Sequence, residues 1–239
     1  MQGFAALYDT IMENADYDGW FNYIYKIIEE KGIKGKDVLD LGCGTAEISI
    51  RFKKKGYSVL GVDISDEMLA IAGEKIDSAG LEIPLAVHDM RNFKLPVGFD
   101  IVVSLFDTVN YLNSIKELEK CMKSVYSHFD REGVFIFDIV TENMMDEMFP
   151  GGSFVDDRED LTLIWSREHD EENGLEEITT TFFVKEKNGK YRRVDDYYTK
   201  KIFTEDEIRD AAEKAGFKRV EFRYDTTLAG ERIFCIAEK

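Results

Sequence analysis

Apolar residues follow two different spacings along the chain, and each spacing predicts one type of element. Short, nearly continuous apolar runs suit buried strands, whereas apolar residues that recur every three or four positions suit helices with one buried face. The apolar runs cover 37–41, 58–63, 83–88, 99–105 and 133–140. Helical spacing covers 46–55, 65–79 and 114–129. Strands that alternate with helices predict an α/β fold with a mostly parallel, doubly wound sheet.

Residues typical of helix starts support this assignment. Ser65 and Ser114 stand where an N-cap side chain is expected, and Ser114 opens the sequence of a capping box. Two further helices are predicted before the first strand, at 4–13 and 17–31. Trp20 lies on the apolar stripe of the second of these helices.

The spacing changes after Gly152 to that of antiparallel strands. The new runs, rich in β-branched and aromatic residues, are 160–169, 175–187 and 190–202. Asn-Gly pairs at 173–174 and 188–189 separate them. Because Asn-Gly between two such runs is a strong hairpin signal, we expect a three-stranded antiparallel meander.

This meander is predicted to be an insert, because about 50 residues of sheet are rarely stable alone. The insert would span 153–201, within a domain formed by 1–152 and 202–239. Helical spacing returns at Thr204 and ends at Gly216. Two last runs, 218–224 and 231–238, are joined by a short loop and predict an antiparallel pair of strands.

Length and cysteine usage limit the class of protein. The 239 residues suit one larger α/β domain with an insert better than two complete domains. No apolar run reaches about 18 residues, and the N-terminus lacks the basic and apolar segments of a secretory signal. Cys43, Cys121 and Cys235 are widely spaced and odd in number, which argues against disulfides and a zinc site. We therefore expect a cytoplasmic protein without a membrane span or a metal centre.

The net charge of −17 argues against a nucleic-acid partner, because phosphate backbones are bound by basic surfaces. The short basic run at 53–55 stands at a predicted helix end, where cations complement the helix dipole, and does not change this expectation. The charge therefore favours a small-molecule ligand.

The first predicted strand carries an acid in its middle and glycines after its end. Gly42 and Gly44 follow Asp40 at the carboxyl end, where open parallel sheets bind ligands and where glycine allows close approach. The sixth position of a G-x-G-x-x-G dinucleotide motif holds Glu47, and the G-x-x-x-x-G-K-[ST] phosphate loop is absent. An acid beside this loop favours a ligand that carries positive charge and no phosphate.

Two more acids end the next two predicted strands. Asp63 follows Asp40 by 23 residues, a separation that suits a carboxylate accepting from both hydroxyls of a ribose. Asp89 follows the third strand, where it could accept from an adenine amino group. Three acids at three successive strand ends predict one ligand site at the carboxyl edge of the sheet.

Four stretches, taken in order within residues 36–140, resemble the motifs of class I S-adenosylmethionine-dependent methyltransferases. They are VLDLGCGTAEIS, GVDISDEML, VHDMRNF and FDIVVSLFDTVNYL, and the last 24 residues resemble the family's terminal strand pair. The resemblance implies a Rossmann-like seven-stranded sheet with an antiparallel last strand, here with a small antiparallel β insert after the fifth strand. It also implies S-adenosylmethionine as cofactor and S-adenosylhomocysteine as product.

The resemblance further implies roles for individual residues. Asp40, Gly42 and Gly44 would cradle the methionine portion of the cofactor. The other implied cofactor residues are Asp63 at the ribose hydroxyls, Ile64 and Met68 along the adenine, Asp89 and Met90 at the adenine edge, and Leu105 near the sulfonium. The family often has glycine where Ala46 stands, and we expect little effect from this departure.

Within the family, the chain resembles a small bacterial subgroup and sugar N,N-dimethyltransferases of the desosamine type. The shared features are an N-terminal YD.IM segment, the DMRNF and SLFDTVNYL stretches and the insert. In such proteins the N-terminal segment folds over the cofactor, which implies that Tyr8 and Trp20 are lid residues. Packing in the core is the alternative for Trp20.

The acceptor site is expected beside the end of the fourth strand. Its candidate residues are Asp107, Asn110 and Tyr111. No catalytic base is assigned, since a neutral amine needs none, whereas an oxygen acceptor usually does. His88, beside Asp89, could lie near the pocket, although a structural role at the strand end suits it better. His128 stands at the edge of a helix stripe, and His169, in the insert, could reach a substrate. The insert would form a roof over the acceptor or the surface of a homodimer.

The predicted reaction is therefore methyl transfer to nitrogen or oxygen of a small molecule. FDTVNY stands where base-modifying relatives carry NPPY or DPPY, which argues against a nucleic-acid acceptor. The alternatives are a methyltransferase acting on RNA or protein, and a cofactor-binding module without catalysis. An NAD-dependent dehydrogenase would need the third glycine that Glu47 replaces.

Overall fold

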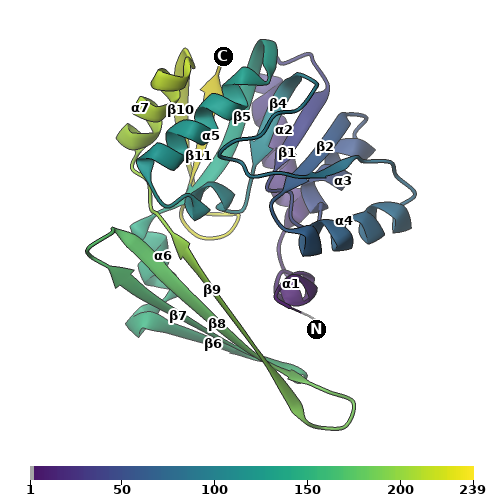
Figure 1. Cartoon of the computed structure of the whole chain (residues 1–239), viewed down its shortest axis with the longest axis vertical. Helices are drawn as coiled ribbons and strands as arrows, with labels where there is room; N and C mark the ends of the chain where they lie inside the picture. The colour runs from purple at the N-terminus through teal and green to yellow at the C-terminus, as the bar shows by residue number, and fades with distance from the viewer. Residues whose placement is uncertain (1–2) are drawn as a thin grey trace.

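The computed structural model describes residues 3–239, which form a seven-stranded and a four-stranded sheet (Figure 1). The larger sheet has the strand order β10-β11-β5-β4-β1-β2-β3. Its strands are β1 (Asp37–Leu41), β2 (Ser58–Asp63), β3 (Leu85–Val87), β4 (Phe99–Ser104), β5 (Phe129–Val140), β10 (Arg219–Asp225) and β11 (Arg232–Glu238). β11 is antiparallel to both β5 and β10, and the other neighbours are parallel. The predicted α/β fold is confirmed.

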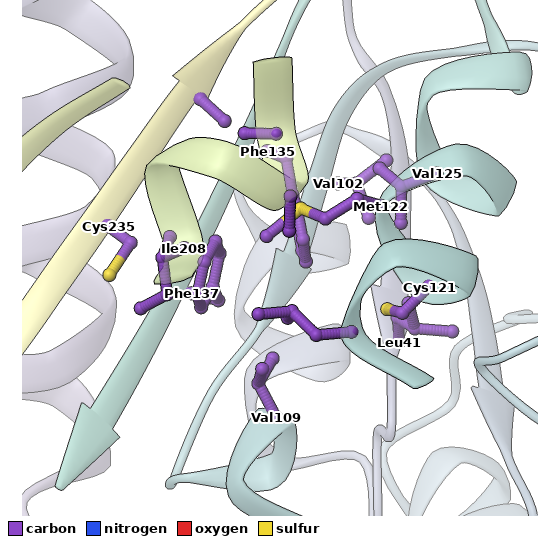
Figure 2. Packing of buried hydrophobic residues seen from close by; sticks show 14 of the residues in the cluster. Leu41, Val102, Val109, Cys121, Met122, Val125, Phe135, Phe137, Ile208 and Cys235 are labelled. Atoms are coloured by element: carbon purple, nitrogen blue, oxygen red, sulfur yellow. The ribbon is translucent and has the colours of Figure 1, made fainter. Parts of the chain in front are cut away.

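Helices cover both faces of the larger sheet. They are α1 (Ala5–Ile11), α2 (Tyr17–Glu30), α3 (Glu47–Lys54), α4 (Asp66–Ser78), α5 (Ile115–Ser127), α6 (Glu142–Met148) and α7 (Glu205–Ala215). One apolar cluster joins α5 and α7 to the sheet, and Figure 2 shows Met122, Phe135 and Ile208 in it. A second cluster joins α2, α3 and α4 to the opposite face, through residues such as Val103. Both faces of these strands are buried, which explains their continuous apolar runs.

The smaller sheet is antiparallel throughout and extends away from the larger one in Figure 1. Its strands are β6 (Ser153–Asp157), β7 (Leu161–Asp170), β8 (Leu175–Lys185) and β9 (Tyr191–Lys200). The prediction of three strands was wrong, because β6 was missed. β6 has only 5 residues and ends in two acids, so its apolar signal is weak. α6 and a short 3₁₀ turn (Thr108–Tyr111) were missed as well.

The predicted starts of helices agree with the structure better than the predicted ends of strands do. Ser65 and Ser114 cap α4 and α5, and Thr204 forms a reciprocal capping box with Glu207 at the start of α7. β3 is shorter and β5 longer than predicted, because pairing with the neighbouring strand sets where a strand ends. None of the helices within residues 3–239 is long and apolar enough to cross a membrane.

Candidate functional site

A cavity of about 680 Å³ opens at the carboxyl ends of β1, β2 and β3. The predicted site residues that border it are Tyr8, Gly42, Gly44, Asp63, Ile64, Met68, Asp89, Met90 and Tyr111. The N-terminal segment contributes Phe4 and Ala5 to the same wall. The volume lies within the range of roughly 300–1,000 Å³ that is usual for small-molecule and cofactor sites. The structure thus brings most of the predicted cofactor residues together around one cavity.

The loop after β1 requires glycine at two positions. Gly42 and Gly44 have positive φ angles of 75° and 52°. A Cβ atom on Gly42 would lie 2.3 Å from Cγ2 of Thr108, whereas the space beside Gly44 is open. Ala46 also has a positive φ, of 67°. This backbone conformation costs a non-glycine residue about 1–2 kcal/mol, so the departure at Ala46 strains the loop more than the sequence suggested.

Asp63 connects this loop to the start of α4. Its Oδ2 accepts a hydrogen bond from the Gly44 N–H at 2.9 Å, and its Oδ1 accepts from the Ser65 N–H at 2.9 Å. Each carboxylate oxygen can accept a further hydrogen bond. The side chain is therefore held in place by the backbone and keeps the capacity to accept from a ligand.

Asp89 contacts Arg91, a residue that the sequence did not single out. The guanidinium of Arg91 donates to both oxygens of Asp89, through Nε at 2.9 Å and Nη2 at 2.5 Å, and also to Glu117 at 2.7 Å. Hydrogen bonding from Arg91 holds the pKa of Asp89 below its usual range. Asp89 is therefore an ionised acceptor that a ligand would share with Arg91.

A small recess adjoins the cavity at the Gly-loop. Its walls include Tyr8, Tyr17, Asp40, Gly42, Gly44, Glu47 and Leu105. Asp40 is buried and accepts from Oγ of Ser49 at 2.6 Å, and burial raises its pKa to about 6. The Tyr17 hydroxyl is buried without a hydrogen-bond partner in the part of the chain that the structure describes. A carboxylate and an unpaired hydroxyl suit the amino and carboxylate groups of an amino-acid moiety.

A second cavity, of about 370 Å³, lies between the insert and the carboxyl ends of β4 and β5. It shares Phe4, Tyr8, Phe106, Tyr111 and Tyr198 with the larger cavity. α6, β7 and β8 supply a large part of the remaining wall, mostly with methionine, aromatic and aliphatic side chains, and residues from 11–16 and 228–232 also border it. Ligands in the two cavities would meet at the shared aromatic residues.

Asp107 is the centre of a buried charge cluster beside this second cavity. Lys200 and Arg232 donate to its carboxylate, and Arg232 also donates to Asp138 at 2.7 Å. Burial opposes ionisation of Asp107, but the two cations hold its pKa below the usual range. Burial raises the pKa of Asp138 to about 6. Phe106 and Asp107 have positive φ angles of 60° and 53°, so the cluster fixes a strained turn.

Five predicted site residues do not border the larger cavity. Asp40 and Leu105 border the recess, Trp20 and Asp107 border the second cavity, and Asn110 borders none of the three. Trp20 is buried, stacks on Phe106 with ring centroids 4.3 Å apart, and also borders the second cavity. Asn110 borders neither cavity. Its side chain accepts from the Val140 N–H and donates to the Lys201 carbonyl, which makes it a structural tie between β5 and the end of β9.

The three histidines lie away from the wall of the second cavity. His128 accepts from the Leu95 N–H at 2.9 Å and is a core residue. His169 lies 2.7 Å from Glu176 within the insert and borders neither cavity. His88 borders the larger cavity. Among the described residues, none of the three histidines lines the wall of the second cavity.

Comparison with known proteins agrees with this geometry. The profile of a methyltransferase domain matches residues 38–133. The Bacillus subtilis protein YqeM, a methyltransferase by name, is 36% identical over an alignment that covers 100% of this chain and 96% of that protein. The dTDP-4-amino-2,3,4,6-tetradeoxy-D-glucose N,N-dimethyltransferase of Saccharopolyspora spinosa is 24% identical, over 90% of this chain and 85% of that protein.

Solved structures give the same assignment. The crystal structure of an S-adenosylmethionine-dependent methyltransferase from Clostridium acetobutylicum matches with a TM-score of 0.87 and 27% identity, over 98% of this chain and 97% of that one. The similarity extends over nearly the whole chain, and thus over both sheets, not over the cofactor motifs alone. This chain therefore belongs to the family of S-adenosylmethionine-dependent methyltransferases and uses their cofactor.

Proposed function

We propose that this methyltransferase transfers the methyl group to a nitrogen or oxygen atom of a small molecule by in-line displacement. The observation that carries the proposal is the pair of cavities that meet at Tyr8, Phe106, Tyr111 and Tyr198. Cofactor in one cavity and acceptor in the other would approach each other at this boundary. Its aromatic rings would exclude water and align the acceptor atom with the methyl group.

The larger cavity would hold the adenosine part of the cofactor. Asp63 would accept hydrogen bonds from the ribose hydroxyls, since the residue borders the cavity and its carboxylate is fixed by the backbone. Ile64 and Met68 would lie along the adenine, and Asp89 and Met90 would lie at its edge. The high exposure of Ile64, 64%, suits a side chain that a flat ring can cover.

The recess would hold the methionine part of the cofactor. Asp40 would face its amino group, and the unpaired Tyr17 hydroxyl would donate to its carboxylate. Gly42 and Gly44 allow the close approach that this arrangement needs. Tyr8, which borders the recess and both cavities, would cover the reacting centre.

The insert 153–201 would roof the acceptor, and the domain of 1–152 and 202–239 would bind the cofactor. Contacts between the insert and α1 support this division of roles. Arg158 donates to the Thr10 carbonyl at 2.8 Å, and the rings of Phe4 and Phe182 lie 6.0 Å apart. The N-terminal segment is thereby held over the boundary between the cavities.

The bound cofactor supplies an electrophilic methyl group, so the protein's part is to position the acceptor. Asp107 is held ionised by Lys200 and Arg232, which makes it a weak base but a fixed hydrogen-bond acceptor. A neutral amine needs no base to attack. The Saccharopolyspora spinosa relative, by its name, methylates an amino group, which favours nitrogen over oxygen as the attacked atom.

Calorimetric titration followed by an acceptor screen tests the proposed function. We expect S-adenosylmethionine and S-adenosylhomocysteine to bind, and small amines to increase the release of S-adenosylhomocysteine from S-adenosylmethionine. Transfer only to RNA or protein fractions, with no turnover on small amines or alcohols, would overturn the proposal.

Asp40→Asn is expected to weaken binding of S-adenosylhomocysteine and to remove its dependence on pH. The folded pKa of Asp40 is raised to about 6, so the carboxylate that would hold the cofactor's ammonium gains a proton as the pH falls. Wild-type affinity should therefore fall by roughly tenfold from pH 7 to pH 5, where the ligand's own amino group stays charged. Calorimetry at both pH values measures this.

The Asp40→Asn variant without bound ligand should fold normally. A raised carboxyl pKa means that the native state favours the neutral form, and asparagine is neutral and can still accept from Ser49. An equal fall in affinity with pH in the variant would show that another group titrates.

A further inference from the structure

The second cavity has an unusual wall for a protein that resembles sugar methyltransferases. Part of this wall is formed by Met144, Met145, Phe149, Ile178 and Phe182, all at most 5% exposed. Buried hydroxyl groups require hydrogen-bond partners, and these side chains offer none. A sugar has a hydroxyl on most of its carbons, and these hydroxyls would find no hydrogen-bond partners among these side chains.

The two cationic side chains of this cavity are already paired. Lys200 and Arg232 are the cations on its wall in the described part of the chain, and both donate to Asp107. Lys200 also lies over the rings of Tyr111 and Tyr198, at 5.1 and 5.6 Å from their centroids. A phosphate or nucleotide diphosphate would need cations that are not neutralised in this way.

One polar atom of the apolar wall lacks a partner. Thr180 is fully buried on β8, between Ile178 and Phe182 on the inner face of the insert, and borders the cavity. Its Oγ1 atom makes no hydrogen bond within residues 3–239. A threonine hydroxyl can both donate and accept, and leaving it unpaired in an apolar wall destabilises the fold. A ligand with one hydrogen-bonding group would satisfy it.

We propose that the acceptor buries an uncharged, mainly apolar body of one or two rings in this cavity and places one hydroxyl or amine group against Thr180. Phosphorylated and nucleotide-linked compounds are excluded from this part of the site. The inference rests on the proposed function, because it assigns the second cavity to the acceptor. The volume, about 370 Å³, is at the small end of ligand cavities, and the three methionines of α6 give a wall that adapts to ring shape.

The test uses a pair of uncharged probes that differ by one hydroxyl, 4-methylphenol and toluene, with glucosamine and thymidine diphosphate as the contrasting compounds. Binding to the full-length protein is measured by ligand-observed NMR, with and without S-adenosylhomocysteine. We expect both aromatic probes to bind, with 4-methylphenol tighter by about three- to tenfold, the value of one neutral hydrogen bond. Thymidine diphosphate should not bind to the second cavity.

Thr180→Val distinguishes a ligand contact from a structural role. The variant should bind both aromatic probes equally, and its Tm should rise by about 2–4 °C, because an unpaired buried hydroxyl is removed. Thr180→Ser keeps the hydroxyl and should keep the preference for 4-methylphenol. An unchanged preference in Thr180→Val would overturn the role of Thr180.

The two proposals fail in different ways. Binding of glucosamine or thymidine diphosphate with the same or greater affinity than 4-methylphenol, or no binding of either aromatic probe, would overturn the acceptor class. Such results would leave the proposed function standing if S-adenosylhomocysteine binds and amines stimulate turnover. If the aromatic probes bind as expected but no small molecule is methylated, the result would instead count against the proposed function.

Discussion

Asp63→Ala is expected to weaken binding of S-adenosylhomocysteine by at least about 100-fold, because hydrogen bonds to a charged acceptor are worth about 1.5–3 kcal/mol each and two are lost. The mutation also frees the N–H groups of Gly44 and Ser65, which Asp63 holds at 2.9 Å. The Gly-loop would therefore lose its fixed shape as well as its ribose acceptor. Calorimetric titration of the variant measures the loss.

Asp66→Ala is the matched control for this experiment. Asp66 is an exposed acid in the first turn of α4, three residues after Asp63, so its removal changes the net charge by the same amount. We expect its affinity to stay within about threefold of wild type, since screening weakens the effect of exposed charges at a distance. Unchanged affinity in Asp63→Ala, or an equal loss in both variants, would remove Asp63 from the cofactor site.

That the proposed cofactor residues lie together could be predicted from sequence, because they follow strand ends in order. A β-strand of a parallel sheet ends at the same edge as its neighbours, so Asp40, Asp63 and Asp89 converge without any long-range information. Their detailed contacts could not be predicted. Arg91, which shares Asp89, sits on a loop whose course depends on packing against Glu117 of α5.

The charge cluster around Asp107, beside the cavity that we propose for the acceptor, could not be predicted because its residues are far apart in the chain. Lys200 and Arg232 meet Asp107 across 93 and 125 residues, and one lies in the insert and the other in the last strand. A sequence shows each of them as an ordinary surface cation. Asn110 was a reasonable acceptor candidate by position, yet the structure uses its amide to bond backbone groups.

Trp20 and β6 show two further limits of sequence patterns. A tryptophan on an apolar helix stripe satisfies both a lid and a core role, and its stacking on Phe106 depends on a strained turn that periodicity does not reveal. β6 pairs with β7 although its sequence, SFVDD, has little strand character. The surroundings of Trp20 and the strand conformation of β6 both depend on tertiary contacts, which local sequence preference does not determine.

Arg232→Met is expected to destabilise the fold by about 3–5 kcal/mol at pH 8, since removal of one partner leaves buried charge uncompensated. Arg232 is 6% exposed and bridges Asp107 and Asp138, which are 9% and 0% exposed. Asp107 keeps Lys200 as a partner, whereas Asp138 loses its ion-pair partner. The double variant Asp138→Asn/Arg232→Met removes that charge and should recover a large part of the loss.

The destabilisation by Arg232→Met should shrink as the pH is lowered from 8 to 5. Burial already raises the pKa of Asp138 to about 6, so the folded state favours the neutral carboxyl group. The stability that this neutral form contributes is lost as the pH rises through about 6. Without Arg232 the pKa of Asp138 rises further, so Asp138 takes up a proton near neutral pH in the variant. The protonated carboxyl group no longer places a charge in the core. Urea unfolding of wild type, single and double variants at pH 5, 6, 7 and 8 measures these differences. A loss of stability in Arg232→Met that is the same at every pH would show that Asp138 is not the charge that Arg232 neutralises.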